Sequence, residues 1–139
     1  MKPYTCDLMP PEAMIPGNCN WCGTRLPRNK DLSIKANRRW CGSKCRMVWE
    51  KNHVWKIARE RALYRDKRCC VKCGATDTAW DGKTKLEVNH IIPLVGRGYS
   101  SSCFHHLDNL ETVCKGCHVT ITKAQRAERK AQAEAEQVD

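Results

Sequence analysis

The chain has 139 residues, a size at which one or two small domains bury a hydrophobic core that gives only marginal stability. Its 25 lysines and arginines outnumber its 15 aspartates and glutamates, for a net charge of +10. No stretch approaches the roughly 18 apolar residues of a membrane span, so the composition excludes a membrane partner. Eleven cysteines offer a second means of holding so small a fold together.

Most of these cysteines fall into Cys-x-x-Cys and Cys-x-x-x-Cys pairs, the spacing at which thiolates converge on one tetrahedral zinc ion. A disulfide framework is the alternative, and it would require a secreted protein. The first twenty residues contain four prolines and no apolar run of seven or more residues, which is unlike a signal peptide. We therefore expect a reducing, cytoplasmic setting with zinc in place of disulfides.

An irregular, proline-rich arm is expected over residues 1–16, followed by a zinc finger over residues 17–50. The halves of this finger are Cys19-Asn20-Trp21-Cys22-Gly23 and Trp40-Cys41-Gly42-Ser43-Lys44-Cys45, with a basic, polar loop between them. Four thiolates complete the coordination of one zinc ion, so this site is closed and structural. They belong to Cys19, Cys22, Cys41 and Cys45.

A basic linker helix is expected over residues 51–68, continuing a helix that Ser43 could cap. A break near Asn52 and His53, giving two helices, is the alternative. The segment from Arg25 to Lys72 holds 16 basic and 4 acidic residues, a net charge of +12. Such a segment predicts a surface that binds nucleic-acid phosphates, and double-stranded DNA is favoured over single strands. The residues expected to contact DNA are Arg38, Arg39, Lys51, Lys56 and Arg59, and Arg97 is a possible further phosphate ligand.

A second zinc-stabilised domain is predicted over residues 69–125, and a charged helical tail over residues 126–139. The thiolates of this second site come from Cys70, Cys73, Cys114 and Cys117. Between the two cysteine pairs we expect a short strand over residues 86–91, a returning strand over residues 110–113, and then a helix that begins near Lys115. Zinc would fix the start of this helix relative to the hairpin.

Residues between and beside these cysteine pairs have the chemistry of phosphodiester hydrolysis. His90 is suited to accept a proton from water, and His118 can bind a divalent metal ion through one ring nitrogen. Asn89 can bind the same ion from the opposing strand. Because neighbouring strand residues point to opposite faces, Asn89 and His90 can point the same way only if the strand bends. Asn109 is suited to tie its loop to the backbone near His90 through its side-chain amide.

Five further residues have no assigned role in this interpretation. We expect His105 and His106, in the loop before Asn109, to be solvated. The alternative is that they help to bind phosphate or a metal ion. Cys6, Cys69 and Cys103 are interpreted as lone thiols that pack as small apolar side chains.

The segment from about Arg65 to Arg129 resembles the zinc-containing HNH endonucleases of phages and bacteria. The motifs that carry the resemblance are Arg65-Asp66, Cys70-x-x-Cys73-Gly74, Asn89-His90-Ile91-x-Pro93, Leu107-Asp108-Asn109-Leu110 and Cys114-x-x-Cys117-His118. The upstream four-cysteine motif resembles a finger that precedes the HNH domain in some bacterial members and in an annealing helicase with a terminal HNH domain.

This resemblance implies a small, zinc-stabilised α+β fold of the ββα-metal type, preceded by a four-cysteine finger. It implies cleavage or nicking of DNA that depends on Mg²⁺ or Mn²⁺, in the cytoplasm of a bacterial or phage-infected cell. Carried over by position, His90 is the general base, His118 a metal ligand and Asn109 the loop-ordering residue. Asn89 stands where the family usually has an aspartate or a histidine. The alternative interpretation is therefore an HNH-fold zinc module that binds DNA with weak or no catalysis.

Overall fold

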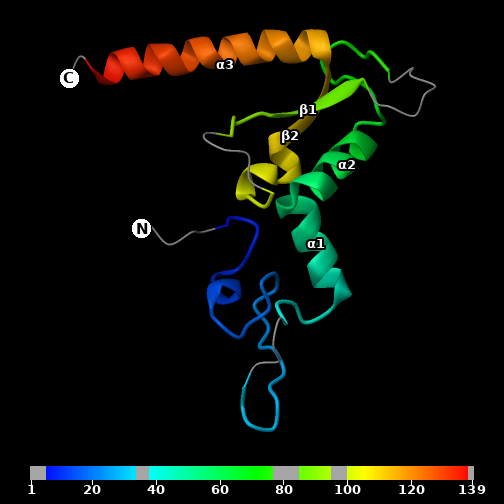
Figure 1. The fold of residues 1–139 in the computed structure, drawn as a ribbon, viewed down its shortest axis with the longest axis vertical. Coiled ribbons are helices and arrows are strands. Elements are labelled where there is room, and N and C mark those ends of the chain that lie inside the picture. The colour runs from blue at the N-terminus through cyan, green and yellow to red at the C-terminus, as the bar shows by residue number, and fades with distance from the viewer. Residues whose placement is uncertain (1–5, 34–37, 77–84, 95–99, 138–139) are drawn as a thin grey trace.

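The structure is a computed structural model that describes residues 6–33, 38–76, 85–94 and 100–137. Its elements, in chain order, are η1 (Pro11–Met14), α1 (Ser43–His53), α2 (Trp55–Arg65), β1 (Leu86–His90), η2 (Cys103–His105), η3 (Leu107–Asn109), β2 (Leu110–Cys114) and α3 (Lys115–Glu136). Figure 1 shows an elongated molecule, with α3 at one end, the N-terminal segment at the other, and the hairpin and α2 between them. The small α+β fold predicted from the sequence is confirmed.

The antiparallel hairpin of β1 and β2 is followed directly by α3, in the order of a ββα fold. Its register places Asn89 opposite Glu111 and His90 opposite Leu110. Because side chains alternate along a strand, Glu87 and Asn89 share one face of the hairpin and His90 lies on the other. These two faces pack against different helices.

The hydrophobic core lies between α2 and the hairpin. Three residues of α2 are fully buried in it, and the strands contribute apolar residues from both sides of the pairing. The core consists of Ala58, Ala62, Leu63, Cys70, Leu86, Val88, Leu110 and Val113, with Trp55, Leu107, Cys114, Cys117 and Ile121 packed against it. Three cysteines, Cys70, Cys114 and Cys117, thus lie in or against this core, so the packing of the second domain is continuous with its cysteine cluster.

The basic helical segment is two helices, which was the alternative expected near Asn52 and His53. Val54 separates them in an extended conformation and forms an isolated antiparallel bridge with Ser101. The next backbone N–H, of Trp55, donates to the carbonyl of Ser100 at 2.9 Å. The helix therefore breaks where the chain pairs with a distant loop. The predicted cap is wrong, because Ser43 is the first helical residue and Gly42 is the N-cap, without a side-chain hydrogen bond.

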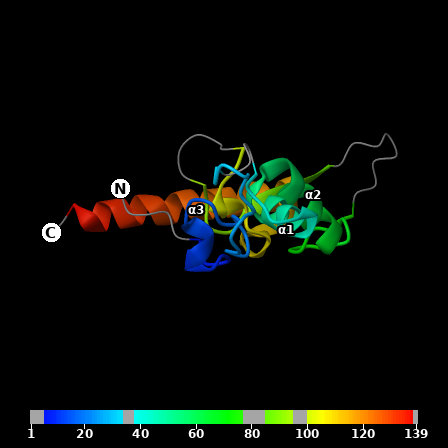
Figure 2. The same ribbon diagram turned by 90° about the horizontal axis from the view of Figure 1, so that it is seen from below.

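The long helix α3 begins at Lys115, as the sequence predicts, and continues without interruption to Glu136. Its first three turns pack on the hairpin with half-buried side chains, whereas residues 126–136 are exposed (Figures 1 and 2). No helix in the described part of the chain is long and apolar enough to cross a membrane.

An ion pair between the exposed Arg65 and the half-buried Asp66 ties the end of α2 to the second strand. Arg65 Nε lies 2.8 Å from Asp66 Oδ1, and its guanidinium also donates to the carbonyl oxygens of Leu107 and Leu110. Asp66 Oδ2 accepts the backbone N–H of Thr112 at 3.0 Å. Burial opposes ionisation of Asp66, but hydrogen bonds from Arg65 and Thr112 outweigh it and leave its pKa below the usual value.

Replacing Asp66→Ala should lower the free energy of unfolding by about 1–3 kcal/mol, because it leaves the Thr112 N–H without its acceptor and removes the carboxylate partner of Arg65. Urea unfolding in zinc-containing buffer measures this change. The matched control is Glu60→Ala, an exposed carboxylate whose ion pairs among the described residues are those with Arg59 and Arg68. Its expected loss is about 0.5 kcal/mol or less. Equal losses in the two variants would show that the Asp66 network does not stabilise the fold.

Candidate active site

Two clusters of four cysteines lie where the sequence places them. They are Cys19, Cys22, Cys41 and Cys45, and Cys70, Cys73, Cys114 and Cys117, and within each the Sγ atoms lie within 4.8 Å of one another. The Cys22–Cys41, Cys41–Cys45 and Cys73–Cys114 Sγ pairs are 3.6, 3.5 and 3.7 Å apart. Thiolates about 2.3 Å from one tetrahedral ion would be about 3.8 Å apart, so each cluster could hold a metal ion.

Glycine makes the tight turn of the first knuckle in each cluster. Gly23 and Gly74 adopt φ values of 74° and 77°, the left-handed region that favours glycine. Their N–H groups donate to the carbonyls of Cys19 at 3.0 Å and Cys70 at 2.8 Å. At Gly23 a Cβ atom would also lie 2.7 Å from Glu12 Cβ. The Cys-x-x-Cys-Gly pattern therefore turns the chain so that both thiols face the same point.

The ring of His90 is fixed from two directions on the α2 side of the hairpin. It stacks on Trp55, with ring centroids 4.9 Å apart, and its Nε2 lies 3.0 Å from Nδ1 of His105. Burial, followed by the proximity of His105, lowers the pKa of His90, so its imidazole is neutral at pH 7. A neutral imidazole in a fixed orientation can accept a proton.

The expectation that His105 and His106 are solvated is wrong. His105 has an exposed fraction of 1% and His106 is half-buried. Both lie in or beside η2, whose first turn is capped by Ser102, which accepts the Phe104 N–H. A single 3₁₀ turn has no hydrophobic periodicity, and so the sequence does not reveal that it buries a histidine.

Asn89 and His118 lie on the α3 side, and each pairs with a glutamate. Asn89 is buried and its Nδ2 donates to Glu111 Oε1 at 3.0 Å, while Glu111 Oε2 lies 2.9 Å from Lys72 Nζ. His118 Nδ1 lies 2.5 Å from Glu87 Oε2. Sequence reasoning missed both glutamates, although Glu87 stands two residues before Asn89 and therefore on the same strand face.

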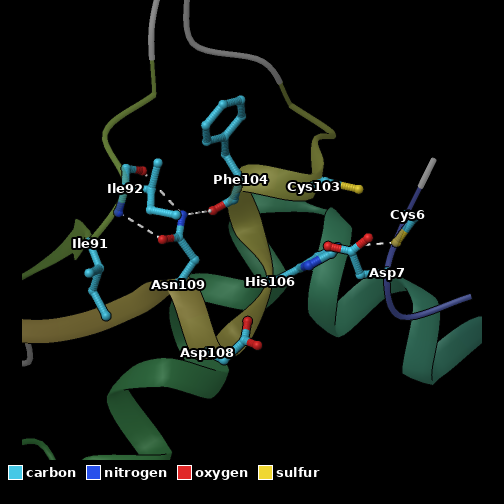
Figure 3. Close-up of a pocket in the computed structure, with 9 residues that line it drawn as sticks. All are labelled: Cys6, Asp7, Ile91, Ile92, Cys103, Phe104, His106, Asp108 and Asn109. Atoms are coloured by element: carbon cyan, nitrogen blue, oxygen red, sulfur yellow. Dashed lines mark hydrogen bonds between the residues drawn. The ribbon is translucent and has the colours of Figure 1, made fainter. Parts of the chain in front are cut away.

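The side chain of Asn109 joins the loop after β1 to η2. Its Oδ1 accepts the Ile92 N–H at 2.8 Å, and its Nδ2 donates to the carbonyls of Ile92 at 3.2 Å and Phe104 at 2.9 Å. Figure 3 shows the amide between these two segments, at the wall of a pocket. The backbone carbonyl of Asn109 also accepts the Ile91 N–H. Three of these contacts hold the chain immediately after His90, and the contact with Phe104 joins it to η2.

The predicted site residues thus occupy two sides of one hairpin. Among the described residues, no hydrogen bond joins Asn89 to His118 or either of them to His90. α3 still reaches the end of β1, because Gln125 Nε2 donates to the carbonyls of His90 at 3.1 Å and Ile91 at 3.2 Å. The end of β1 is therefore the place where the two sides meet.

The residues expected to contact DNA differ in exposure. Arg38, Arg39 and Lys56 are exposed, whereas Lys51 and Arg59 are half-buried. Arg38 donates to the carbonyls of Trp40 and Cys41, and Arg59 pairs with Glu60 at 3.1 Å. Arg97, a possible phosphate ligand, lies outside the described residues.

Comparison with known proteins identifies the class of enzyme and the family to which this chain belongs. Residues 70–124 match the family model described as HNH endonuclease. A protein of Lactococcus phage SK1 described as "Probable HNH endonuclease" is 35% identical over 71 residues, which are 50% of this chain and 70% of the phage protein. No solved structure shows a significant match. The chain belongs to the HNH endonuclease family, of phage type, and is an enzyme.

Replacing Asn109→Ala should speed hydrogen exchange of the Ile92 amide by about 10²-fold, because the loop loses three hydrogen bonds that each contribute about 1 kcal/mol. Exchange monitored by NMR measures this change, with the Val71 amide, bonded to Thr112 O at 2.9 Å, as the internal reference. Asn29→Ala is the control, because within the part of the chain that the structure describes this exposed amide donates to Ser33 Oγ and does not contact the Ile92 loop. An unchanged Ile92 rate in Asn109→Ala would rule out a loop-ordering role.

Proposed function

We propose that the chain hydrolyses phosphodiester bonds of duplex DNA, with His90 as the general base and one divalent ion, Mg²⁺ or Mn²⁺, bound by Asn89 and His118. The observation that carries this proposal is that each histidine is held at one ring nitrogen, which leaves the other for chemistry. Nicking and double-strand cleavage both fit this chemistry.

The contact with Glu87 prepares His118 to bind a metal ion. When the Nδ1–H of a neutral His118 donates to the Glu87 carboxylate, the lone pair of Nε2 is left for the ion. Metal-binding histidines in proteins usually donate their other ring N–H to a carboxylate or a carbonyl in this way. A bound divalent ion supplies charge stabilisation at the phosphoryl oxygens and the departing sugar oxygen.

His90 is prepared for a different task by the same kind of contact. A neutral His90 that donates from Nε2 to His105 Nδ1 keeps its own Nδ1 free to accept a proton from water. Stacking on Trp55 prevents the ring from turning away. His105 is thus a positioning residue in this proposal.

Asn89 supplies a neutral oxygen, and neighbouring carboxylates supply the negative charge. Its Nδ2 donates to Glu111, which directs the amide oxygen away from that carboxylate. Glu87 and Glu111 lie on the same hairpin face as Asn89. Their charges favour a divalent ion close to Asn89 and His118 even though residue 89 itself is uncharged.

The two four-cysteine clusters are structural zinc sites in this proposal, because four thiolates leave no open position for substrate. The exposed cations at Arg38, Arg39 and Lys56, with Lys51 and Arg59 beside them, bind DNA phosphates of any sequence. The reaction takes place in the cytoplasm of a bacterial or phage-infected cell.

Incubation with supercoiled plasmid, with and without Mg²⁺ or Mn²⁺, tests this function. Cutting that depends on the metal ion supports it, whereas plasmid retention without cutting favours the alternative, a DNA-binding HNH module with weak or no catalysis. His90→Ala should lower the cleavage rate by about 10²–10⁴, as expected for loss of a general base, with the zinc content and DNA retention unchanged. Wild-type cleavage by this variant would place the base elsewhere.

Asn89→Asp should lower the metal concentration for half-maximal cleavage by about tenfold, because affinity for hard divalent ions rises with the charge of the ligands. Titration of Mg²⁺ and of Mn²⁺ against the cleavage rate measures this change. Asn89→Ala is the companion variant and should raise the required concentration. An unchanged or higher requirement in Asn89→Asp would show that the amide is a fully adequate ligand or that residue 89 does not bind the ion.

A further inference from the structure

A third group of metal-ligating side chains lies outside both four-cysteine clusters. Its ligand atoms lie within 4.8 Å of one another and belong to Cys6, His53, Cys103 and His106. Cys6 precedes η1, His53 ends α1, Cys103 begins η2 and His106 follows it. Figure 3 shows Cys6, Cys103 and His106 gathered at one side of the pocket. Three segments far apart in the sequence therefore converge on one point.

The separations between these atoms fit a tetrahedral ion. Cys6 Sγ lies 3.4 Å from Nε2 of His53 and 3.4 Å from Nε2 of His106, and the two Nε2 atoms are 3.3 Å apart. With Zn–N near 2.0–2.1 Å and Zn–S near 2.3 Å, a tetrahedron has N···N edges of about 3.3 Å and S···N edges of about 3.5 Å. All three measured edges agree with these values to within about 0.2 Å.

The hydrogen bonding of His53 leaves a lone pair directed into the cluster. Its Nδ1 lies 2.8 Å from the carbonyl oxygen of Trp49, which can only accept, so Nδ1 carries the proton. In a neutral ring Nε2 is then unprotonated, and it is Nε2 that faces Cys6 and His106. The ring is 2% exposed and stacks on Trp49 with centroids 4.7 Å apart. A histidine held in this way is ready to bind a metal ion.

Charge favours zinc at this buried place. Two thiolates and two neutral imidazoles around Zn²⁺ form a neutral unit, which avoids the cost of burying a net charge. Two sulfur and two nitrogen ligands in a tetrahedron are typical of zinc. We propose that Cys6, His53, Cys103 and His106 bind a third structural zinc ion. Cys6 and Cys103, interpreted from the sequence as lone packing thiols, are ligands in this proposal.

Such an ion would fasten a loop that already contacts the junction of α1 and α2. Ser102 N–H donates to the His53 carbonyl at 2.9 Å, and Leu107 N–H donates to Asn52 Oδ1 at 3.1 Å. His105, between two of the ligands in η2, contacts His90. The ion would therefore hold the N-terminal segment and this histidine in place. The proposal of a third zinc site does not depend on the proposed nuclease mechanism.

The zinc content of protein purified without chelator tests the proposal. We expect three zinc ions per wild-type chain by elemental analysis, and two in Cys6→Ser and in Cys103→Ser. Cys69→Ser is the matched control and should keep three, because Cys69 lies outside the three clusters found among the described residues and its Sγ donates to the Lys67 carbonyl. Two ions in the wild-type chain, or three in both serine variants, would overturn the proposal.

The nuclease site could also bind zinc, and the His118→Ala variant shows which of the two sites holds the third ion. A third ion that is lost in His118→Ala but kept in Cys6→Ser and Cys103→Ser lies in the nuclease site, and the proposal is then wrong. If a serine variant does not fold, the Co²⁺-substituted wild-type chain provides a second measurement. Three bound Co²⁺ ions, one with the weaker thiolate-to-metal absorption of two sulfur ligands, support the proposal, and only two four-thiolate ions contradict it.

Discussion

The register of β1 and β2 is the constraint on which the arrangement of the site depends. Asn89 pairs with Glu111 and His90 with Leu110, so successive residues of one strand serve different sides of the hairpin. A slip of one residue would exchange the two sides, moving His90 toward α3 and Asn89 toward the core. The buried apolar residues Leu86 and Val88 oppose such a slip, because it would move them out of the core. Core packing therefore determines which helix each functional side chain faces.

Contacts from outside the hairpin maintain this register in a sheet of only two strands, which would be marginal alone. Asp66 binds the Thr112 N–H in the middle of β2, and Asn109 holds the chain just beyond His90. The cluster that contains Cys70 and Cys114 joins the end of β2 to the segment after α2. Each contact acts at a different point along the strands, so the hairpin is restrained at both ends and at its centre.

The sequence predicts features that depend on spacing along the chain, and it fails where distant segments meet. Cysteine spacing identifies both four-cysteine clusters, and β-branched and apolar residues identify the hairpin. The helix break at Val54 could not be located from spacing alone, because it depends on the pairing of Val54 with Ser101, a residue far away in the sequence. The burial of His105 and the approach of Cys6 to Cys103 likewise depend on how three segments pack. No local sequence pattern predicts those contacts. A single cysteine or histidine has the same sequence signature whether its side chain is solvated, packed in a core or part of a metal-binding group.

The identity of residue 89 affects the hairpin as well as any ion bound there. An amide at this position donates to Glu111 across the strands, whereas an aspartate would place two carboxylates directly opposite each other. Like charges in that arrangement destabilise a strand pair, and Lys72, which already pairs with Glu111, offsets only part of the repulsion. Asparagine therefore stabilises the metal-free hairpin at a place where a carboxylate would require a cation. In our proposal the negative surroundings of the ion come from Glu87 and Glu111, so that charge is distributed around residue 89 and the strand pairing remains intact without the ion.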